Sequence, residues 1–346
     1  MRFAVIGAGH GGQAMAAFIA SKGYETTLFN RTSSVIEEIR KNNGINLRGY
    51  VEKKVENILL TNDLKVACDN SDIIMVCIPA NAHEDLACHI APYIRANHII
   101  VINPGRTLGA FYFNKNLKKY NCTCSPIIAE TDTFILTSRK IRNGLSDIMS
   151  FKNEVFIAAD TKENTDKVYK ILIEAFPILK KADSYVYTSM ANIGCIFHPI
   201  PSIFNIGRIE NKQRYLHYKE GITPSICNLL EKLDYERVML AKNIGVTIPT
   251  AKQWLNNVYG SKGDSLFEVL QNTEAYNEVL APTKMSTRYI YEDISTGIVP
   301  MYYLAREIDS PNTILGMVIE LSTEMFNYDF VENGRCDVSD FIKKYK

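Results

Sequence analysis

Short runs of β-branched and apolar residues alternate with helical patterns along the first half of the chain. The runs are Phe3–Ile6, Thr26–Phe29, Ile73–Ile78, Ile99–Ile102 and Ile127–Ala129. Each is short and apolar enough to form a buried strand. Because strands that alternate with helices form parallel sheets, the pattern predicts a doubly wound α/β sheet for this half.

Two helices of the first half have clear sequence boundaries. The helix after the first strand carries an apolar stripe over Ala14–Ile19 and ends at Gly23, a residue typical of helix C-caps. The next helix is predicted to begin at Ser34, because Glu37 three residues later completes a capping box.

The second half has a different pattern, with long helical stretches from about Thr188 onward. Its clearest helix has Thr223 as N-cap, Pro224 in the first turn and Gly245 as terminator. Strand signals are scarce here, so we predict an all-α C-terminal domain. The predicted division is residues 1–184 and residues 185–346, with no linker between them.

Length and composition agree with two soluble domains. The 346 residues exceed one ordinary core, and a net charge of +1 without long runs of one sign argues against a nucleic-acid or membrane surface. The eight cysteines lack CxxC spacing, which predicts reduced thiols in a cytoplasmic protein. We expect no signal peptide, because the first residues already form a strand, and no membrane span.

The segment Gly7-Ala8-Gly9-His10-Gly11-Gly12 follows a predicted strand and opens a predicted helix. In that context a G-x-G-x-x-G pattern indicates a Rossmann-type dinucleotide site. Gly7 permits the tight turn, Gly9 lets the backbone approach a pyrophosphate, and Gly12 lets the helix pack closely on the strand. The helix N-terminus would supply amide donors to the phosphates. Residues 1–184 are therefore predicted to bind a nicotinamide cofactor, and residues 185–346 to hold the substrate and the catalytic groups.

The end of the second strand selects between NAD and NADP. A carboxylate there would bind the adenosine ribose, but the strand continues as Asn30-Arg31-Thr32. Since Arg31 and the hydroxyl groups after it could hold a 2′-phosphate, the sequence favours NADP(H). An arginine can also stack on adenine without discriminating, or simply be a solvated surface residue, so NAD(H) stays an alternative.

Two further strands end in turns at the carboxyl edge of the sheet, where ligands of open α/β sheets bind. They continue as Ile78-Pro79-Ala80 and Asn103-Pro104-Gly105-Arg106. Either could be only a turn, but the two together favour a cofactor site. The predicted cofactor-binding residues are Gly7, Gly9, His10, Gly11, Gly12, Asn30, Arg31, Thr32, Pro79, Ala80 and Asn103. No metal site is predicted.

Among the six histidines, only His198 has a sequence context that suggests chemistry. A lone histidine among apolar residues is more often a structural core group. Arg288, Glu292 and Asp293 cluster later in the chain, and a buried aspartate could orient an imidazole acting as general acid or base. The cluster could equally be an exposed helix face, and spacing alone does not decide.

Taken together, these motifs resemble the octopine/nopaline (opine) dehydrogenase family. The resemblance spans nearly the whole chain in the right order, which makes it more specific than any single motif. The residues that carry it are Gly7–Gly12 with Ala14-Met15-Ala16, Ile78-Pro79-Ala80, Asn103–Thr107, Ala129-Glu130-Thr131, His198-Pro199, Asn205–Glu210, Glu220-Gly221-Ile222, Asp234–Arg237, Arg288-Tyr289-Ile290 and Glu292-Asp293.

The resemblance implies both a fold and an activity. The expected fold is a Rossmann-type domain followed by an all-α domain like the C-terminal domain of 6-phosphogluconate dehydrogenase. Family members use a nicotinamide to condense an α-keto acid reductively with the amino group of an amino acid, giving a secondary amine dicarboxylate. Pyruvate is the first expectation for the keto acid, with 2-oxoglutarate and glyoxylate as alternatives.

The resemblance also implies site residues. His198 matches the catalytic histidine, Asp293 its paired aspartate, and Arg288 the arginine that binds a substrate carboxylate. Glu130 matches a glutamate that faces the cationic end of the amino acid. The family often continues with tyrosine and cysteine where this chain has Leu136 and Ser138, so the amino acid itself is not predicted.

Two other functions share this two-domain frame. A ketone reductase of the ketopantoate reductase or glycerol-3-phosphate dehydrogenase type would use a lysine as general acid, and no lysine has a comparable motif. A non-enzymatic NADP-binding redox sensor would not need His198, Arg288 and Asp293 together. We expect small-molecule substrates, no nucleic-acid or membrane partner, and a monomer or homodimer.

Overall fold

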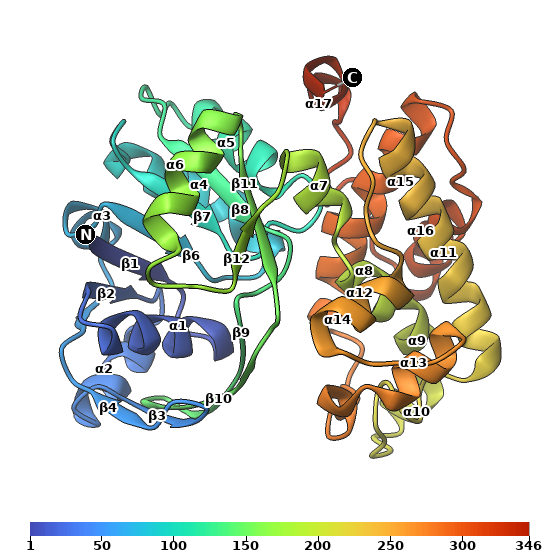
Figure 1. Ribbon diagram of the computed structural model, residues 1–346, viewed down its shortest axis with the longest axis horizontal. Coiled ribbons are helices and arrows are strands. Elements are labelled where there is room, and N and C mark those ends of the chain that lie inside the picture. Colours follow the sequence, from blue (N-terminus) through green and yellow to red (C-terminus); the bar gives the residue numbers. More distant parts are fainter. Residues whose placement is uncertain (346) are drawn as a thin grey trace. The chain divides into compact units, whose positions relative to one another are not determined.

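The computed structural model describes residues 1–345, which form two compact units. The first comprises Met1–Gly105 and Gly109–Tyr185, drawn from blue to green in Figure 1. The second comprises Arg106–Leu108 and the chain from Val186 onward. The predicted division does not foresee that Arg106–Leu108 packs with the second unit.

The first unit is built on an eight-stranded sheet with the order β12-β11-β8-β7-β6-β1-β2-β5. Neighbouring strands from β5 to β8 are parallel, whereas β11 is antiparallel to β8. The predicted doubly wound parallel sheet is confirmed, with an unpredicted antiparallel edge. The strands are β1 (Arg2–Ile6), β2 (Glu25–Phe29), β5 (Leu59–Thr61), β6 (Ile73–Val76), β7 (Ile99–Ile102), β8 (Ile127–Thr131), β11 (Val155–Ala159) and β12 (Leu179–Lys181).

The strand order reverses beside β1. The chain proceeds from β1 to β2 on one side, and β6 later pairs with the other side of β1, so that Val5 lies between Leu28 and Met75. Crevices at such reversal points, at the carboxyl ends of the strands, are where open α/β sheets bind ligands. The glycine-rich turn that follows β1 lies at this point.

A second, four-stranded sheet has the order β4-β3-β10-β9, with β3 (Ile45–Gly49), β4 (Lys53–Val55), β9 (Leu136–Arg142) and β10 (Leu145–Phe151). None of these strands is predicted by the apolar runs, because their exposed faces carry charged residues. A local signal does exist: β9 and β10 are joined by Asn143-Gly144, a strong hairpin dipeptide, with Gly144 at φ 81°.

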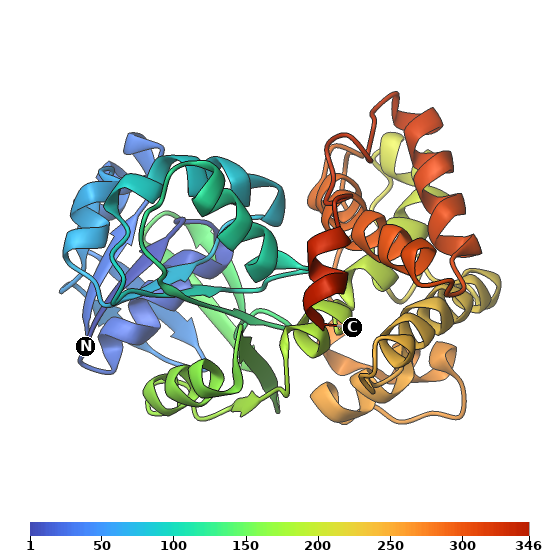
Figure 2. The same ribbon diagram turned by 90° about the horizontal axis from the view of Figure 1, so that it is seen from above.

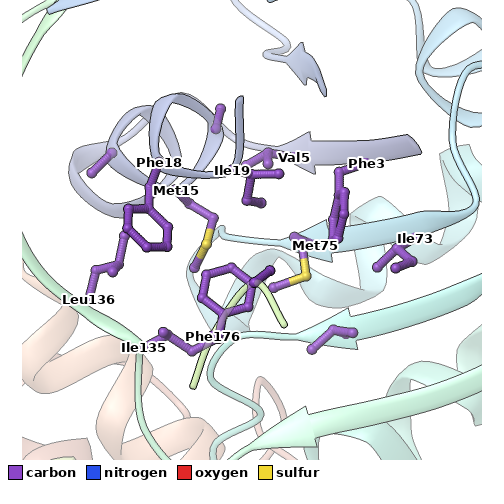
Figure 3. Close-up of a cluster of buried hydrophobic side chains, with 14 of the residues drawn as sticks. Phe3, Val5, Met15, Phe18, Ile19, Ile73, Met75, Ile135, Leu136 and Phe176 are labelled. Atoms are coloured by element: carbon purple, nitrogen blue, oxygen red, sulfur yellow. The ribbon is translucent and has the colours of Figure 1, made fainter. Parts of the chain in front are cut away.

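Helices flank the large sheet. They are α1 (His10–Ser21), α2 (Ser33–Lys41), α3 (Leu64–Asp69), α4 (His83–Ile90), α5 (Gly109–Lys119) and α6 (Lys162–Leu172), with single 3₁₀ turns at Ala80–Ala82 and Ala91–Tyr93. Figure 3 shows the core that holds α1 on the sheet, where Met15, Phe18 and Ile19 gather with Val5 and Met75. Removing this apolar surface from water is the main force that fixes α1 against β1.

The helix boundaries agree with the sequence at α1 and depart from it at α2. Helix α1 ends just before Gly23, which has a φ of 93°. Helix α2 begins at Ser33 with Thr32 as N-cap, and no side chain caps it. The predicted capping box is therefore wrong: the Glu37 carboxylate pairs with Arg40 one turn later instead.

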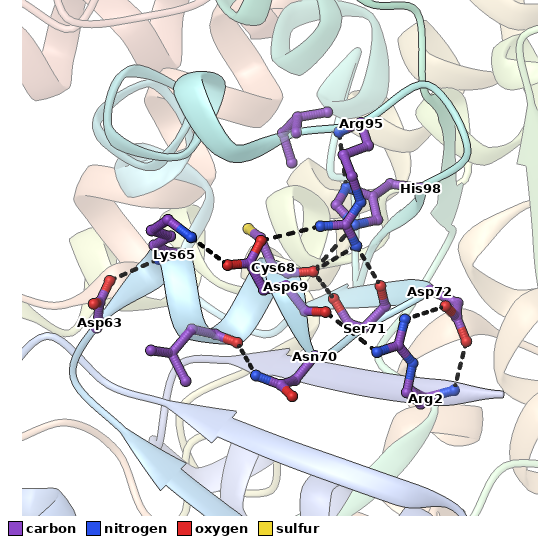
Figure 4. Close-up of polar contacts among 12 residues, drawn as sticks. Arg2, Asp63, Lys65, Cys68, Asp69, Asn70, Ser71, Asp72, Arg95 and His98 are labelled. Carbon is purple, nitrogen blue, oxygen red and sulfur yellow. Dashed lines mark hydrogen bonds and ion pairs between the residues drawn. The ribbon is translucent and has the colours of Figure 1, made fainter.

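The end of α3 is held by two side chains from another part of the chain (Figure 4). Arg95 Nη2 donates to the carbonyl oxygens of Cys68 and Ser71 at 2.9 and 3.1 Å. The buried His98 places Nε2 3.2 Å from the Cys68 oxygen and accepts from Arg95 N through Nδ1 at 3.0 Å. These contacts satisfy carbonyl groups that a helix end leaves unpaired, so His98 is a structural histidine.

The second unit is helical, and its helices cross one another at varied angles (Figure 2). Its described residues form only an isolated bridge, Leu216 with Leu280, and no strand. The predicted all-α domain is confirmed. The helices are α7 (Tyr185–Met190), α8 (Gly194–Phe197), α9 (Pro199–Phe204), α10 (Ile206–Glu210), α11 (Pro224–Asn243), α12 (Ala251–Tyr259), α13 (Leu266–Asn272), α14 (Arg288–Asp293), α15 (Val299–Glu307), α16 (Thr313–Phe326) and α17 (Ser339–Tyr345), with a 3₁₀ turn at Glu274–Tyr276 and a π turn at Ile294–Ile298.

Helix α11 follows its sequence signals closely. Thr223 is the N-cap and its hydroxyl accepts from Ile226 N, while Pro224 occupies the first turn. Gly245, with φ 91°, follows the helix end. Within residues 1–345, no helix combines the length and apolar character that crossing a membrane would require.

Candidate active site

The glycine-rich turn between β1 and α1 has the geometry that its sequence predicts. Gly7 has a φ of 103°, and a Cβ atom there would lie 2.5 Å from Ile78 Cγ2. A Cβ atom on Gly12 would lie 1.7 Å from the Gly7 oxygen, so only glycine permits this approach of helix to strand. Gly9 differs, because no atom lies within 4 Å of its Cβ position. The open side of Gly9 leaves room for a phosphate.

Gly11 faces a side chain that the sequence did not indicate. A Cβ atom on Gly11 would lie 2.3 Å from Phe134 Cζ, so any larger residue here would displace an aromatic ring that packs on the helix. His10 is exposed, and its Nδ1 accepts from Lys140 N at 3.0 Å.

A cavity of about 580 Å³ adjoins the turn within the first unit. Five predicted cofactor-binding residues line it, namely Gly7, Asn30, Arg31, Thr32 and Pro79. Acidic and aromatic residues complete the wall, among them Asp63, Asp85 and Tyr93. The structure thus brings three strand ends that are distant in sequence to one cavity.

Asn30 and Arg31 have different surroundings at this cavity. Asn30 Oδ1 accepts from Ala8 N at 3.0 Å, which ties the end of β2 to the glycine turn. The Arg31 side chain is 87% exposed and lies 3.2 Å from Asp85 Oδ2. Arg31 therefore lies at the solvent edge of the cavity with a carboxylate beside it.

Two other predicted cofactor residues are buried. Ala80 begins the 3₁₀ turn after Pro79. Asn103 Oδ1 accepts from Thr131 Oγ1 at 2.9 Å and from Ile135 N at 3.3 Å, while its Nδ2 is a buried donor without a hydrogen-bond partner among the described residues. A buried unpaired donor is unfavourable unless a ligand satisfies it.

The second unit holds the catalytic candidates. His198 joins α8 to α9, and its Nδ1 lies 2.7 Å from Asp293 Oδ2 at the end of α14. Its Nε2 lies 3.1 Å from the Tyr218 hydroxyl, and the ring of Tyr289 stacks on the imidazole at 4.0 Å. The His198 side chain is only 12% exposed. The structure thus brings together the histidine and the aspartate, which are 95 residues apart.

Asp293 is completely buried yet ionised. Burial by itself would raise its pKa, but Arg106 and His198 outweigh that effect and hold the pKa of Asp293 at about 2. Arg106 Nη1 lies 3.5 Å from Asp293 Oδ1. The sequence had indicated Arg106 only as part of a turn at the cofactor edge, so its place beside Asp293 was missed.

The protonation of His198 follows from these neighbours. Burial lowers its pKa, and Asp293 opposes this effect without overcoming it. An ionised carboxylate at Nδ1 favours the tautomer with the proton on that atom, which leaves Nε2 to accept from the Tyr218 hydroxyl. A neutral imidazole with a basic Nε2 can take up and release a proton.

Arg288 and Glu292 lie on the same helix as Asp293. The Arg288 side chain is 55% exposed, and its Nε lies 3.6 Å from Glu292 Oε2. Glu292 is buried, and its other oxygen lies 3.1 Å from Arg106 Nε. The Arg288 guanidinium is thus exposed one helical turn from the catalytic candidates.

Glu130 lies in the first unit, at the end of β8. Its Oε2 accepts from Ala110 N at 2.7 Å, in the first turn of α5, and it packs against Gly105. These contacts place the Glu130 carboxylate beside the backbone of a helix N-terminus, where a carboxylate is stabilised.

Two aromatic residues of the site were missed at the sequence level. Tyr289 stands inside a motif that resembled the family, beside Arg288, but nothing in its spacing indicated a ring stacked on His198. Tyr218 had no signal at all. In the described part of the chain, no group of three or more His, Cys, Asp or Glu residues could hold a metal ion.

Both halves of the chain match known protein families. Residues 2–106 match the N-terminus of NAD-dependent glycerol-3-phosphate dehydrogenase, and residues 181–326 match the alpha-helical domain of NAD/NADP octopine/nopaline dehydrogenase. The opine dehydrogenase of Arthrobacter sp. (strain 1C) is 31% identical over 334 residues, which cover 96% of this chain and 93% of that protein. The chain belongs to the opine dehydrogenase family.

Solved structures agree with this membership at the level of the fold. An octopine dehydrogenase in complex with NADH and agmatine has a TM-score of 0.81 at 18% identity and covers 100% of this chain and 95% of its own. A yersinopine dehydrogenase with bound NADP⁺ has a TM-score of 0.75 at 12% identity, with coverages of 100% and 98%. As an opine dehydrogenase family member, the chain is an NAD(P)-dependent oxidoreductase acting on CH–NH donors. The expectation of an enzyme is confirmed.

Proposed function

We propose that this chain uses NAD(P)H to condense an α-keto acid, pyruvate, with the amino group of an L-amino acid. The carbonyl and the amine lose water to form a C=N bond, and reduction of that bond gives a secondary amine dicarboxylate. The observation that carries the proposal is the 2.7 Å contact of His198 Nδ1 with the buried Asp293 carboxylate. A general acid/base held in this way suits a reaction in which a nitrogen gains and loses protons.

The residues of the first unit fit a nicotinamide dinucleotide. The open side of Gly9 and the amides at the start of α1 would hold the pyrophosphate. Asn30, Arg31 and Thr32 would contact the adenosine side, while Pro79, Ala80 and the unpaired Asn103 Nδ2 would contact the nicotinamide side. When bound, the cofactor supplies the hydride that reduces the C=N carbon.

We favour NADP(H) over NAD(H) as the cofactor. Arg31 and Thr32 line the cavity at the end of β2, where an NAD-selective site would carry an acid. The nearby carboxylate of Asp85 pairs with Arg31. A 2′-phosphate would compete with Asp85 for Arg31, and a doubly charged phosphate is the stronger partner.

The residues of the second unit would handle the substrate and its protons. His198 exchanges a proton with the substrate nitrogen, and Asp293 holds the imidazole tautomer and stabilises its charged form. Arg288 binds the keto-acid carboxylate through its planar guanidinium, which fixes the reacting carbon. Glu130 is proposed to face the amino-acid ammonium group, as the family resemblance implies.

The test is to follow NADPH and NADH oxidation with pyruvate against each of the twenty amino acids. The proposal expects oxidation that requires both pyruvate and an amine, and faster oxidation of NADPH. Pyruvate-dependent oxidation without any amine would instead indicate a ketone reductase. The His198→Gln variant tests whether the oxidation depends on the His198 imidazole, because this variant should lose turnover while still binding the cofactor.

A further inference from the structure

A buried cation lies between two buried carboxylates beside His198. Arg106 Nε lies 3.1 Å from Glu292 Oε1, and Arg106 Nη1 lies 3.5 Å from Asp293 Oδ1. The three side chains are 8%, 4% and 0% exposed. Buried charges persist only when they compensate one another, so the Arg106 guanidinium is the group that compensates the Asp293 carboxylate here.

The backbone that carries Arg106 is fixed within the helical unit. Thr107 N donates to Thr296 O at 3.1 Å, and Leu108 N donates to Ser189 Oγ at 3.2 Å. Arg106 itself has a φ of 63°, a left-handed conformation that is unfavourable for a residue other than glycine. The hydrogen bonds of the next two residues thus hold the Arg106 backbone in this unfavourable conformation, and the backbone in turn fixes the position of the guanidinium.

Gly194 leaves the space that the guanidinium occupies. A Cβ atom on Gly194 would lie 2.4 Å from Arg106 Nη1 and 3.0 Å from Asp293 Oδ1. Asn192, two residues earlier, accepts from Arg106 Nη1 at 3.4 Å. The start of α8 is therefore shaped around the contact between Arg106 and Asp293.

We propose that Arg106 is a positioning residue for the reaction: its guanidinium keeps the Asp293 carboxylate ionised and directed at His198 Nδ1. The inference rests on the proposed role of His198 as the proton carrier. Glu292 completes the arrangement, because its two oxygens face Arg106 and Arg288. The keto-acid-binding arginine and the positioning arginine therefore share one buried carboxylate.

Several groups facing His198 determine how it titrates. Burial lowers its pKa, Asp293 raises it, and the positive charges of Arg288 and Arg106 lower it further. Tyr218, Tyr289 and His217 also adjoin the ring, and His217 stays neutral near pH 7 because burial lowers its pKa to about 3. Asp293 raises the pKa of His198 more than Arg106 lowers it. Loss of Arg106, and with it of the ionised Asp293 contact, should therefore lower the pKa of His198.

The test is the pH dependence of turnover in Arg106→Gln, measured with saturating pyruvate, amine and cofactor. We expect kcat to fall by up to about a hundredfold, because Asp293 no longer fixes the imidazole. The pH midpoint of kcat should move downward, because the raising effect of the ionised Asp293 is lost. Arg106→Lys keeps the charge, so its midpoint should lie closer to that of the unchanged enzyme.

Two further variants separate positioning from folding. Gly194→Ala leaves every charge in place but displaces Arg106, and should shift the midpoint in the same direction. Arg237→Gln removes another buried arginine, whose Nη2 lies 2.6 Å from Asp234 Oδ1. This variant should lower stability without moving the midpoint. An unmoved midpoint in both Arg106→Gln and Gly194→Ala overturns the proposal. If Arg106→Gln does not fold, Gly194→Ala decides alone.

A readout without turnover distinguishes this proposal from the proposed function. The His198 imidazole can be titrated by ¹⁵N NMR in the substrate-free protein, with His198→Gln identifying its signal. A lower midpoint in Gly194→Ala or Arg106→Gln supports the positioning role even if no keto acid and amine pair is turned over. Absence of turnover in the unchanged enzyme would contradict the proposed function only.

Discussion

The ring of Tyr289 lies parallel to the imidazole of His198, with 4.0 Å between the centroids and 9° between the planes. Tyr289 is the second residue of α14, and Asp293, which contacts His198 Nδ1, is the last. One helix therefore restrains the imidazole both through its face and through its edge. Helix α14 is therefore the element that fixes the orientation of the His198 imidazole, as the proposed general acid/base role requires.

Replacement of His198 by alanine should abolish most turnover. The imidazole is the proposed proton carrier, and loss of a general acid/base typically costs about 10²–10⁴-fold in rate. Cofactor affinity should change little, since the cavity near Gly7 belongs to the first unit. Steady-state kinetics and a cofactor titration by fluorescence measure the two effects. Full activity of the variant would refute the proposed mechanism.

Replacement of Arg288 by alanine should mainly raise the KM for the keto acid. The guanidinium is exposed and can bind a carboxylate with two parallel hydrogen bonds. Arg288→Lys should recover only part of the loss, because an ammonium group does not reproduce that fork. The measurement is kcat and KM for pyruvate at fixed amine. A KM close to that of the unchanged enzyme would assign carboxylate binding to another residue.

Replacement of Arg31 by alanine should weaken NADPH binding by about tenfold or more and leave NADH binding nearly unchanged. The physical reason is the loss of a charge-assisted contact to the 2′-phosphate. Asp85→Asn is the companion variant, because it removes the carboxylate that competes for Arg31; it should strengthen NADPH binding. Equal losses for both cofactors in Arg31→Ala would indicate stacking on adenine instead.

His98 should make the protein less stable in acid. Burial lowers the pKa of His98 below its ordinary value of 6.5, so the unfolded chain binds the proton more readily than the folded one. Its contribution is complete above about pH 6.5 and is lost as the pH falls through the lowered pKa.

His98→Gln should cost about 1–2 kcal/mol at pH 8, where the contacts to Cys68 and Arg95 are intact. Its stability should then fall less steeply between pH 7 and 5 than that of the unchanged protein. Urea unfolding at several pH values measures this. His89→Gln is the control, since His89 is exposed; a similar change in both variants would argue against a special role for His98.

Local sequence was sufficient where one short segment determines its own conformation. The turn at Gly7 and the ends of α11 at Thr223 and Gly245 follow from backbone freedom and capping, and the structure has them as predicted. The Asn143-Gly144 hairpin has an equally local signal. It was not predicted because the charged residues of its two strands interrupt the apolar runs by which strands were recognised. The prediction of a capping box at Ser34 was wrong, because the Glu37 carboxylate pairs with Arg40 instead.

The sequence by itself determined the two-domain fold and the glycine-rich turn and, through the family resemblance, it named His198, Asp293 and Arg288 as candidate catalytic residues. Only the tertiary structure decided that Arg106 turns into the helical unit beside Asp293, and that Tyr218 and Tyr289 surround the imidazole. The spacing of apolar residues along the chain indicates which face of a helix or strand is buried. It does not indicate which side chains from distant parts of the sequence contact that face. That choice depends on packing and on the mutual compensation of buried charges, which arise only when the whole unit has folded.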